Sequence, residues 1–283
     1  MLSIQTLLKK YGIVPKKSLG QHFLSEAPTI RKIVAAIEPS KEDCIIEIGP
    51  GLGIMTHLLA KRAAAVFAIE RDRKLIEIAR KEHSDIKNIV WIQGDILKLK
   101  LDDILEKSPK LSHEHNIKVI GNLPYNISTP ILFWILSRRS LISRATIMVQ
   151  KEVSLRITAK PCCKDYGILS VQVQAYAKAK RLFDVSARNF FPAPEVTSSV
   201  VDIDFTKADV EKPKDEALFK TLVRAAFGKR RKTLRNSLIG AVNFDLSASD
   251  VDCLLRHANI NGTRRAETLT VSEFIKLASL MEE

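Results

Sequence analysis

The sequence predicts an α/β fold with a mostly parallel sheet, followed by a small all-helical domain. Between about residues 28 and 160, short apolar runs rich in Ile and Val alternate with helical patterns, as in parallel strands joined by crossover helices. The runs are continuous rather than alternating, as expected for strands buried on both faces. Beyond residue 207, a charged, proline-containing linker precedes helical patterns only. We therefore expect two domains, 1–207 and 208–283.

The individual elements follow from the positions of the apolar runs. Residues 54–62 and 74–82 place apolar side chains at helical spacing. Residues 169–176 alternate like a strand, but their length and position also fit a helix, which is the reading we adopt. Residues 181–205 contain two further strand candidates, separated by NFFPAPEV. The earlier runs read as strands are 44–48, 66–69, 89–92, 119–120 and 145–149.

Length and charge narrow the class of protein. At 283 residues the chain is long for one domain and short for two of full size, so we expect one large domain with a smaller appendage. Its 45 Lys and Arg outnumber 32 Asp and Glu, and the formal net charge of +13 favours nucleic acid or an anionic membrane surface as partner. No apolar segment approaches the roughly 20 residues that cross a bilayer, and no signal peptide is visible. We expect a cytoplasmic protein without a membrane partner.

Two other features carry little functional information. Residues 1–25 form a basic segment without acids, which faintly resembles a transit peptide. We do not adopt that reading, because motif residues begin within the segment. The four cysteines show neither zinc spacing nor a secreted disulfide framework, so we expect reduced thiols and no metal site.

A glycine-rich turn follows the first predicted strand. Gly49, Gly51 and Gly53 lie in EIGPGLG, where glycine permits positive φ and the close approach of a ligand. Tight packing of a strand on a helix also selects small residues, so the turn alone does not establish a site. Its spacing differs from G-x-G-x-x-G, and the pyrophosphate cradle of a dinucleotide site is not met.

Acids follow the next two predicted strands. Glu70 lies about 20 residues after the turn, where a carboxylate can accept both hydroxyls of a ribose. An exposed acid within the charged run ERDRK is an equal alternative. Asp95 follows the third strand and is placed to accept from an exocyclic adenine amine. Together the three strand ends predict an adenosine-containing ligand without a pyrophosphate, which S-adenosylmethionine satisfies.

The fourth predicted strand ends in Asn122-Leu123-Pro124-Tyr125. A proline turn explains this string equally well by residue type, because Pro124 cannot donate a ladder hydrogen bond. The alternative is methyl transfer to N6 of adenine, whose lone pair is delocalised into the ring. If the Asn122 side-chain oxygen and the Leu123 carbonyl accept from this amine, they favour a tetrahedral nitrogen with its lone pair towards the methyl donor. Tyr125 would stack on the extruded base, and no metal or covalent nucleophile is required.

Longer sequence motifs along the chain resemble those of one protein family. Asn-Leu-Pro-Tyr is similar to the [D/N/S]-x-P-[Y/F/W] motif of amino-methyltransferases that act on nucleobases. In order and across nearly the whole chain, the sequence resembles the ribosomal RNA adenine dimethyltransferases, the KsgA family. The resemblance implies a Rossmann-like class I methyltransferase domain with a mostly parallel seven-stranded sheet, and a helical RNA-binding domain over 208–283. The strings that carry it are KKSLGQHFL, EIGPGLG, GNLPYNIST, QKEV, YGILSV, FFPAPEV and FGKRRKTLRNSL.

The resemblance also implies an activity and a partner. The reaction would make N6,N6-dimethyladenosine at two adjacent adenosines in the 3′-terminal hairpin loop of small-subunit rRNA, using four S-adenosylmethionines. The protein would act as a monomer on a pre-30S-type particle, as part of ribosome biogenesis.

Carried over residue by residue, the family pattern implies a set of cofactor contacts. Gly49 would face the methionine part of S-adenosylmethionine, Glu70 its ribose and Asp95 its adenine. Asn122 would touch both cofactor and target amine. Many relatives have Asn where this chain has His22, which leaves the role of the His22 side chain open. The implied cofactor-binding residues are His22, Leu24, Gly49, Glu70, Asp95 and Asn122.

A second aromatic is implied by FFPAPEV. The family pattern F-x-P-x-P-x-V places its first Phe at Phe190, which would sandwich the flipped adenine with Tyr125; the alternative is a core aromatic beside a proline turn. Phe191 occupies a variable slot and is expected to be structural. The predicted catalytic residues are Asn122, Leu123, Tyr125 and Phe190.

The string KRRKTLR concentrates positive charge where a helix could lie along phosphates. Most such runs are only solvated faces, but the basicity of the chain and the base-modifying motif favour RNA contact. Phosphate neutralisation would make binding fall steeply with salt. Lys16 and Lys17 would extend this surface. The predicted RNA-binding residues are Lys229, Arg230, Arg231, Lys232 and Arg235.

Other functions remain compatible with the sequence. A non-catalytic RNA-binding assembly or transcription factor on the same fold is one, but the intact strand-end residues favour an enzyme. A large-subunit rRNA adenine methyltransferase and a DNA adenine methyltransferase are the others. GNLPYNIST and FGKRRKTLRNSL favour the small-subunit enzymes, and relatives that act on DNA more often carry Asp at the Asn122 position.

Overall fold

The structure is a computed structural model that describes residues 3–16, 19–107, 116–229, 231–241, 244 and 246–282. The chain divides into two compact units, and one break lies next to the predicted boundary at residue 207. Residues 155–179, which the sequence assigns to the first domain, group instead with the C-terminal helices. The first unit comprises Met1–Ser154 and Lys180–Phe205, and the second comprises Leu155–Ala179 and Thr206–Glu283.

A seven-stranded sheet organises the first unit. Its order is β4-β3-β2-β5-β6-β9-β7, so the chain moves outward from β2 in both directions. The pairs from β4 to β6 are parallel, whereas β9 runs antiparallel to β6. This architecture confirms the predicted fold class. The strands are β2 (Asp43–Ile48), β3 (Ala65–Glu70), β4 (Ile89–Gln93), β5 (Asn116–Asn122), β6 (Ile142–Gln150), β7 (Lys178–Val185) and β9 (Ser198–Asp204).

The five strands predicted from apolar runs are all present, and each is longer than its run. The difference is largest in β5, where the apolar pair 119–120 becomes Asn116–Asn122. Backbone pairing with β2 and β6 keeps the polar residues Lys118 and Asn122 in the ladder. Apolar patterns report buried side chains, whereas a strand is held by backbone hydrogen bonds, so the pattern underestimates strand ends.

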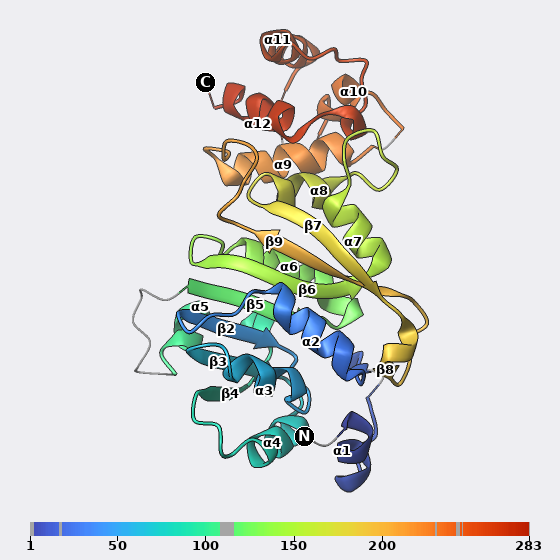
Figure 1. The fold of residues 1–283 in the computed structure, drawn as a ribbon. Helices are drawn as coiled ribbons and strands as arrows, with labels where there is room; N and C mark the ends of the chain where they lie inside the picture. The colour runs from blue at the N-terminus through green and yellow to red at the C-terminus, as the bar shows by residue number, and fades with distance from the viewer. Residues whose placement is uncertain are drawn as a thin grey trace. The chain divides into compact units, whose positions relative to one another are not determined.

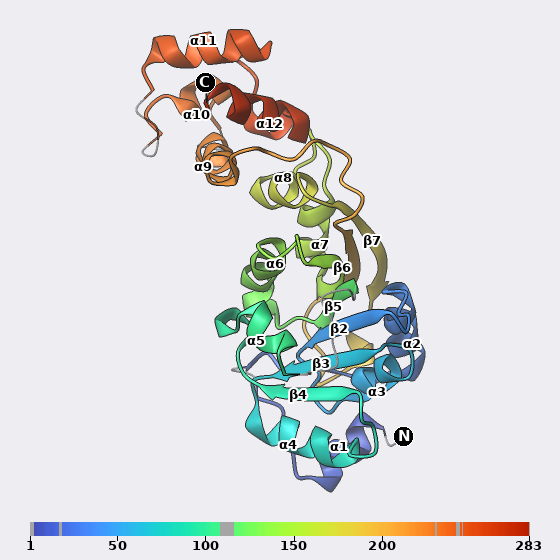
Figure 2. The ribbon, with the colours of Figure 1, turned by 90° about the vertical axis from the view of Figure 1, so that its left-hand side faces the viewer.

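Helices cover both faces of this sheet. Figure 2 shows α2 and α3 on one face and α5 and α6 on the other. On α2, Ile30, Ile33 and Val34 recur at helical spacing and pack into one core with Ile45 of β2 and Ala68 of β3. The helices of this unit are α1 (Ile4–Lys10), α2 (Ala27–Ala36), α3 (Ile54–Ala60), α4 (Arg73–Glu82), α5 (Leu101–Leu105) and α6 (Ser128–Leu136), with 3₁₀ turns η2 (Ile96–Lys98), η3 (Tyr125–Ile127) and η4 (Ala187–Asn189). The next helix, α7 (Lys151–Thr158), begins in the first unit and continues into the second.

A short strand pair joins two distant segments of the first unit. β1 (Phe23–Leu24) runs antiparallel to β8 (Phe190–Phe191), and the Ser25 N–H donates to the Asn189 carbonyl at 2.8 Å. Two residues are too few for a readable alternation, so the sequence gives no signal for this pair. Its effect is to bring GQHFL beside FFPAPEV.

The second unit is helical and has its own core. Tyr176, Phe219 and Phe274 are each at most 2% exposed and belong to this core. Residues 169–176 form most of α8, which confirms the helical reading. Figure 1 shows α9 to α12 gathered in the orange and red part of the chain, and none of the described helices is long and apolar enough to span a bilayer. The helices are α8 (Ile168–Gln174), α9 (Glu216–Phe227), α10 (Leu234–Leu238), α11 (Ala248–Ala258), η5 (Ala266–Thr268) and α12 (Val271–Leu280).

Candidate active site

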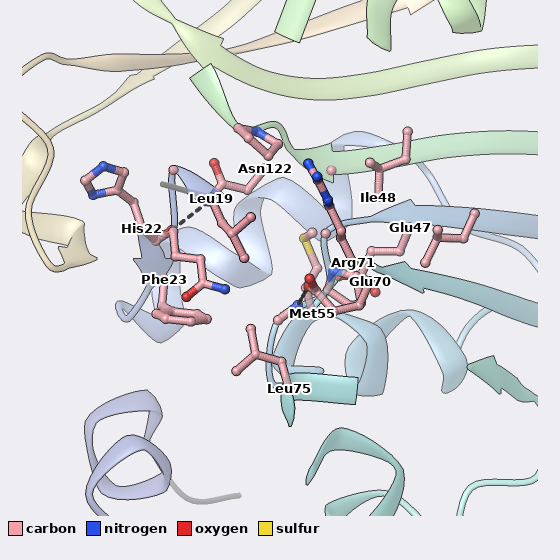
Figure 3. A pocket seen from close by; sticks show the side chains of 18 of the residues that line it. Leu19, His22, Phe23, Glu47, Ile48, Met55, Glu70, Arg71, Leu75 and Asn122 are labelled. Atoms are coloured by element: carbon pink, nitrogen blue, oxygen red, sulfur yellow. Dashed lines mark hydrogen bonds between the residues drawn. The ribbon is translucent and has the colours of Figure 1, made fainter. Parts of the chain in front are cut away.

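A pocket lies at the carboxyl ends of the central strands of the first unit. Ligands of open parallel sheets bind at such an edge, at the point where the strand order changes direction, here between β2 and β5. Figure 3 shows His22 and Phe23 on one side of the pocket, Glu70 and Arg71 on the other, and Asn122 between them. The residues predicted to bind the cofactor, all of which line this pocket, are His22, Leu24, Gly49, Glu70, Asp95 and Asn122.

The turn after β2 requires glycine for two reasons. Gly49, Gly51 and Gly53 have φ of +70°, +58° and +79°, the left-handed region that side chains other than glycine rarely adopt. At Gly53, an added Cβ would also lie 2.7 Å from the Trp91 ring and 2.8 Å from the His83 ring. The Gly49 N–H donates to the Ile69 carbonyl at 3.0 Å, which ties the turn to the end of β3. The backbone of this turn therefore lies against the pocket in a fixed conformation.

Glu70 is buried and anchored, not an exposed acid of a charged run. Its side chain accepts from the Gly51 N–H at 3.1 Å and from the Asp72 N–H at 2.8 Å. Burial raises the pKa of Glu70, and these backbone hydrogen bonds oppose the shift. Because two N–H groups fix the carboxyl group, the remaining lone pairs keep one orientation at the pocket.

Asp95 lies at the start of η2, beside a cation. It accepts from the Leu97 N–H at 3.1 Å, and its other oxygen lies 3.9 Å from Nη1 of Arg71. The Arg71 side chain is 62% exposed and lines the same pocket. The sequence did not single out Arg71, although its place directly after Glu70 was an available signal.

Asn122, the last residue of β5, has a defined amide orientation. Its Nδ2 donates to the His22 backbone carbonyl at 2.9 Å, which leaves Oδ1 as the acceptor of this side chain. Close packing of β2 and β5 brings this residue to the glycine turn: an added Cβ on Gly121 would lie 2.6 Å from the Ile48 carbonyl oxygen. Leu123, next in the chain, is 1% exposed, and its N–H donates to the Met148 carbonyl at 3.1 Å.

His22 contacts two of the motifs through its side chain. Its ring is stacked on Tyr125, with ring centroids 5.7 Å apart and planes 21° apart. Its Nδ1 donates to the Pro192 carbonyl at 2.8 Å, and the Tyr125 hydroxyl lies 2.6 Å from Oγ of Ser198. The imidazole thus bridges the Tyr125 turn and the proline-rich loop, contacts that only the tertiary structure reveals.

The two phenylalanines of FFPAPEV differ from each other in exposure. Phe190 is 4% exposed, pairs with Leu24 and packs in the core that contains Met148. Phe191, expected to be structural, is 41% exposed. The two side chains leave β8 on opposite faces, as neighbours in a strand do, so only one of them reaches solvent.

The basic segment of the second unit is mostly a turn. Lys229, Arg231 and Lys232 are exposed and precede α10, which begins only at Leu234. Within this string, α10 includes only Leu234 and Arg235, because Thr233 caps the helix by accepting from the Asn236 N–H.

Arg235, at the end of this segment, makes an ion pair within the second unit. Its Nε and Nη2 lie 2.5 and 2.8 Å from the two carboxylate oxygens of Asp252. Arg230 and Lys17, two other predicted RNA contacts, lie outside the described residues.

The seven-stranded sheet, with a pocket at the carboxyl ends of its central strands, defines a class: the Rossmann-like methyltransferases. A family model described as ribosomal RNA adenine dimethylase matches residues 14–277. "Ribosomal RNA small subunit methyltransferase A" of Syntrophus aciditrophicus is 41% identical over 280 residues, covering 99% of this chain and 98% of that protein. The protein of the same name from Clostridium botulinum strain Langeland is 38% identical, covering 98% of both. The chain belongs to the ribosomal RNA adenine dimethylase family and is an S-adenosylmethionine-dependent methyltransferase.

Solved structures support the fold. A dimethyladenosine transferase from Plasmodium falciparum has a TM-score of 0.76 at 24% identity, covering 90% of this chain and 96% of that one. The 23S rRNA methyltransferase ErmE has a TM-score of 0.68 at 24% identity, covering 92% and 100%. At this level of identity the likeness shows the fold alone, and the fold does not choose the substrate.

Proposed function

We propose that this protein transfers methyl groups from S-adenosylmethionine to N6 of two adjacent adenosines in the 3′-terminal hairpin loop of small-subunit rRNA. Family membership and the names of the full-length relatives support the reaction and the rRNA. The observation that carries the assignment of the site is Asn122: its amide is oriented by the His22 carbonyl in the same pocket as Gly49 and Glu70.

The strand ends provide one site for each part of the cofactor. In this proposal the glycine turn faces the methionine part, the anchored Glu70 carboxylate accepts from the ribose hydroxyls, and Asp95 accepts from the adenine amine. His22 and Leu24 contribute contacts from the opposite side of the pocket. The bound cofactor supplies a methyl group on a positively charged sulfur, and the protein positions this methyl group against the target amine.

Asn122 and Leu123 have the task of making a poor nucleophile reactive. Oδ1 of Asn122 and the Leu123 carbonyl oxygen accept hydrogen bonds from the two N–H groups of the target amine. These hydrogen bonds favour a tetrahedral nitrogen whose lone pair points at the methyl group. The orientation of the Asn122 amide supports this assignment, because a flipped amide would present a donor to the amine. Burial of Leu123 keeps its carbonyl in place.

In this proposal Tyr125 stacks on the target base, and Phe190 is the second aromatic residue that the family resemblance implies. The Tyr125 ring is held by the hydrogen bond between its hydroxyl and Ser198, and it already carries the His22 ring on one face. Because stacking tolerates any π-face, the Tyr125 ring is a surface on which an adenine can stack. Phe190 reaches a base only if its pairing with Leu24 loosens, since it is 4% exposed.

The second unit supplies RNA affinity in this proposal, through Lys229, Arg231 and Lys232, with Arg230 as a neighbour in sequence. Their exposure and the net charge of +13 support contact with phosphates. We propose that the protein works as a monomer in the cytoplasm, on rRNA within a pre-30S-type particle.

A methylation assay tests the proposal directly. Small-subunit particles, naked small-subunit rRNA, large-subunit rRNA and DNA are each incubated with the protein and S-adenosylmethionine, and modified nucleosides are located by mass spectrometry. We expect N6,N6-dimethyladenosine at two adjacent positions of small-subunit RNA only. Modification confined to large-subunit RNA would change the substrate, and RNA binding without cofactor binding or transfer would favour the non-catalytic assembly factor.

A further inference from the structure

The segment 191–198, which leads from β8 into β9, forms one side of the candidate active site. Near its start, the Pro192 carbonyl accepts from Nδ1 of His22 at 2.8 Å. At its end, Oγ of Ser198 lies 2.6 Å from the hydroxyl of Tyr125. Hydrogen bonds therefore tie both ends of the segment to aromatic side chains that lie beside the proposed place of the target adenosine.

Phe191, next to Pro192, exposes an aromatic ring at this place. It is 41% exposed, whereas the preceding Phe190 is 4% exposed. Single exposed apolar side chains are common on protein surfaces. What distinguishes Phe191 is its position beside the carbonyl that receives the His22 ring, where a nucleobase can stack on it. The other exposed large apolar side chains among the described residues are Val14, Leu97, Leu141, Leu182 and Val196.

Arg188, in η4 just before β8, adds a positive charge to the same stretch of chain. Its side chain is exposed, and no acid pairs with it among the residues that the structure describes. Two other cations of this unit, Lys151 and Arg181, lie 2.8 and 2.7 Å from the carboxylate of Asp184 and are already paired. Proteins that hold single-stranded nucleic acid combine such a cation for the backbone with an aromatic ring for a base.

We infer that Phe191 and Arg188 form a second nucleotide subsite, which holds the nucleotide next to the adenosine being methylated. This inference rests on the proposed function and deepens it. Extrusion of an adenosine from its stack leaves the neighbouring base without one stacking partner, which opposes extrusion. The Phe191 ring replaces the lost partner, and the Arg188 guanidinium neutralises the phosphate of that neighbour. The subsite thus stabilises the RNA conformation in which the target base is extruded.

The direction of the RNA strand gives this subsite a distinctive property. Because it lies on one side of the target base, it holds either the 5′ or the 3′ neighbour, and not both. A ring that stacks on the target base itself would act whichever neighbour is present. A ring that only packs within the protein would respond to neither neighbour. These three roles of Phe191 therefore differ in their response to the removal of one neighbouring base.

The test compares the full-length wild-type protein with Phe191→Ala on three small-subunit rRNAs. One RNA is unmodified, and the other two carry an abasic nucleotide directly 5′ or directly 3′ of one target adenosine. Single-turnover methylation of that adenosine is followed by mass spectrometry at limiting RNA concentration and saturating S-adenosylmethionine. On the unmodified RNA, Phe191→Ala should lower the rate about tenfold, as expected for the loss of one base–aromatic stack.

The abasic RNAs then identify the base that Phe191 contacts. With the abasic nucleotide on one side of the target, the difference between wild type and Phe191→Ala should disappear; with it on the other side, the difference should remain. A difference that remains on both abasic RNAs would place Phe191 on the target base and overturn the inference. Equal rates for the two proteins on the unmodified RNA would overturn it as well.

Further variants separate stacking from packing. Phe191→Tyr keeps the ring and should remain close to wild type, whereas Phe191→Leu keeps apolar area without a π-face and should resemble Phe191→Ala. Leu182→Ala, at a side chain that is 40% exposed on β7, is the matched control and should leave the rate unchanged. A Phe191→Leu variant with the wild-type rate would show that stacking is not involved.

The phosphate contact has its own measurement. Arg188→Ala should weaken RNA binding and reduce the slope of log K against log salt by about 1, whereas Arg188→Lys should keep most of the slope. An unchanged slope would remove Arg188 from the subsite. Failure of the proposed function is visible before any variant is made: the wild-type protein would methylate neither adenosine of small-subunit rRNA, and the inference would fall with it.

Discussion

The strand ends of the first unit and the basic segment of the second were both predicted from short sequence motifs. Their side chains are held in different ways. At the strand ends, Glu70 accepts from two backbone N–H groups and Asn122 donates to a backbone carbonyl, so their orientations follow from the sheet. In the basic segment 229–235, Lys229, Arg231 and Lys232 are exposed in a turn. We expect positions fixed by backbone to carry large, specific effects, and solvated charges to carry smaller, cumulative ones.

The largest expected effect belongs to Asn122. Asn122→Ala removes an acceptor that acts on the reacting amine, and kcat should fall about 10²–10³-fold, as on removal of one preorganised hydrogen-bond partner of a transition state. The affinity for S-adenosylmethionine, measured by calorimetry, should change much less. Asn122→Asp keeps an acceptor but loses the donor to the His22 carbonyl, so its kcat should lie between those of the wild-type protein and Asn122→Ala. Near-normal turnover of Asn122→Ala would show that the amine is not activated here.

Tyr125 should have the next largest effect. Tyr125→Ala removes a stacking platform worth about 1–3 kcal/mol per base, so KM for the RNA should rise about tenfold or more. Tyr125→Phe keeps the ring and loses only the hydrogen bond to Ser198, and it should remain close to wild type. Steady-state kinetics on folded RNA separate the two variants; equal values would argue against stacking.

A smaller and salt-dependent effect is expected from the basic segment. The combined change of Lys229, Arg231 and Lys232 to Ala should weaken RNA binding about tenfold at physiological salt and reduce the slope of log K against log salt by roughly 2. Lys276→Ala, an exposed charge on α12, is the control. Filter binding over a salt series provides the measurement. An unchanged slope would mean that these side chains form only a solvated face.

Substitution of Arg235 should have the smallest effect on RNA binding. Because Arg235 lies in the same basic string as Lys229, Arg231 and Lys232, it allows a paired charge to be compared with exposed ones. Its guanidinium is held by both oxygens of Asp252, so its charge is already balanced. Arg235→Lys keeps the charge but not the fork geometry. RNA affinity should stay within about twofold, since exposed ion pairs contribute little, while the melting temperature falls slightly. A loss of RNA affinity as large as that of the combined variant would reverse this ranking.

Much of the candidate site was predicted from the sequence, because parallel strands end at one edge of the sheet and the end of each strand carries one informative residue. Gly49, Glu70, Asp95 and Asn122 were predicted and all line one pocket. The sequence did not predict the contacts of the His22 ring, which depend on Pro192 and Tyr125, distant in the chain. Nor did it predict which phenylalanine of β8 is exposed, because a strand of two residues has no pattern to read.

By itself the sequence determined the sheet, the order of the strand ends and the family, since apolar runs, glycines and acids at strand ends are local properties of the chain. Only the tertiary structure decided which polar groups are paired. It gave Glu70 two backbone donors and left Glu47, on the neighbouring strand, with none among the described residues. The physical reason is that satisfaction of a buried polar group depends on atoms brought from elsewhere in the chain, whereas apolar periodicity does not.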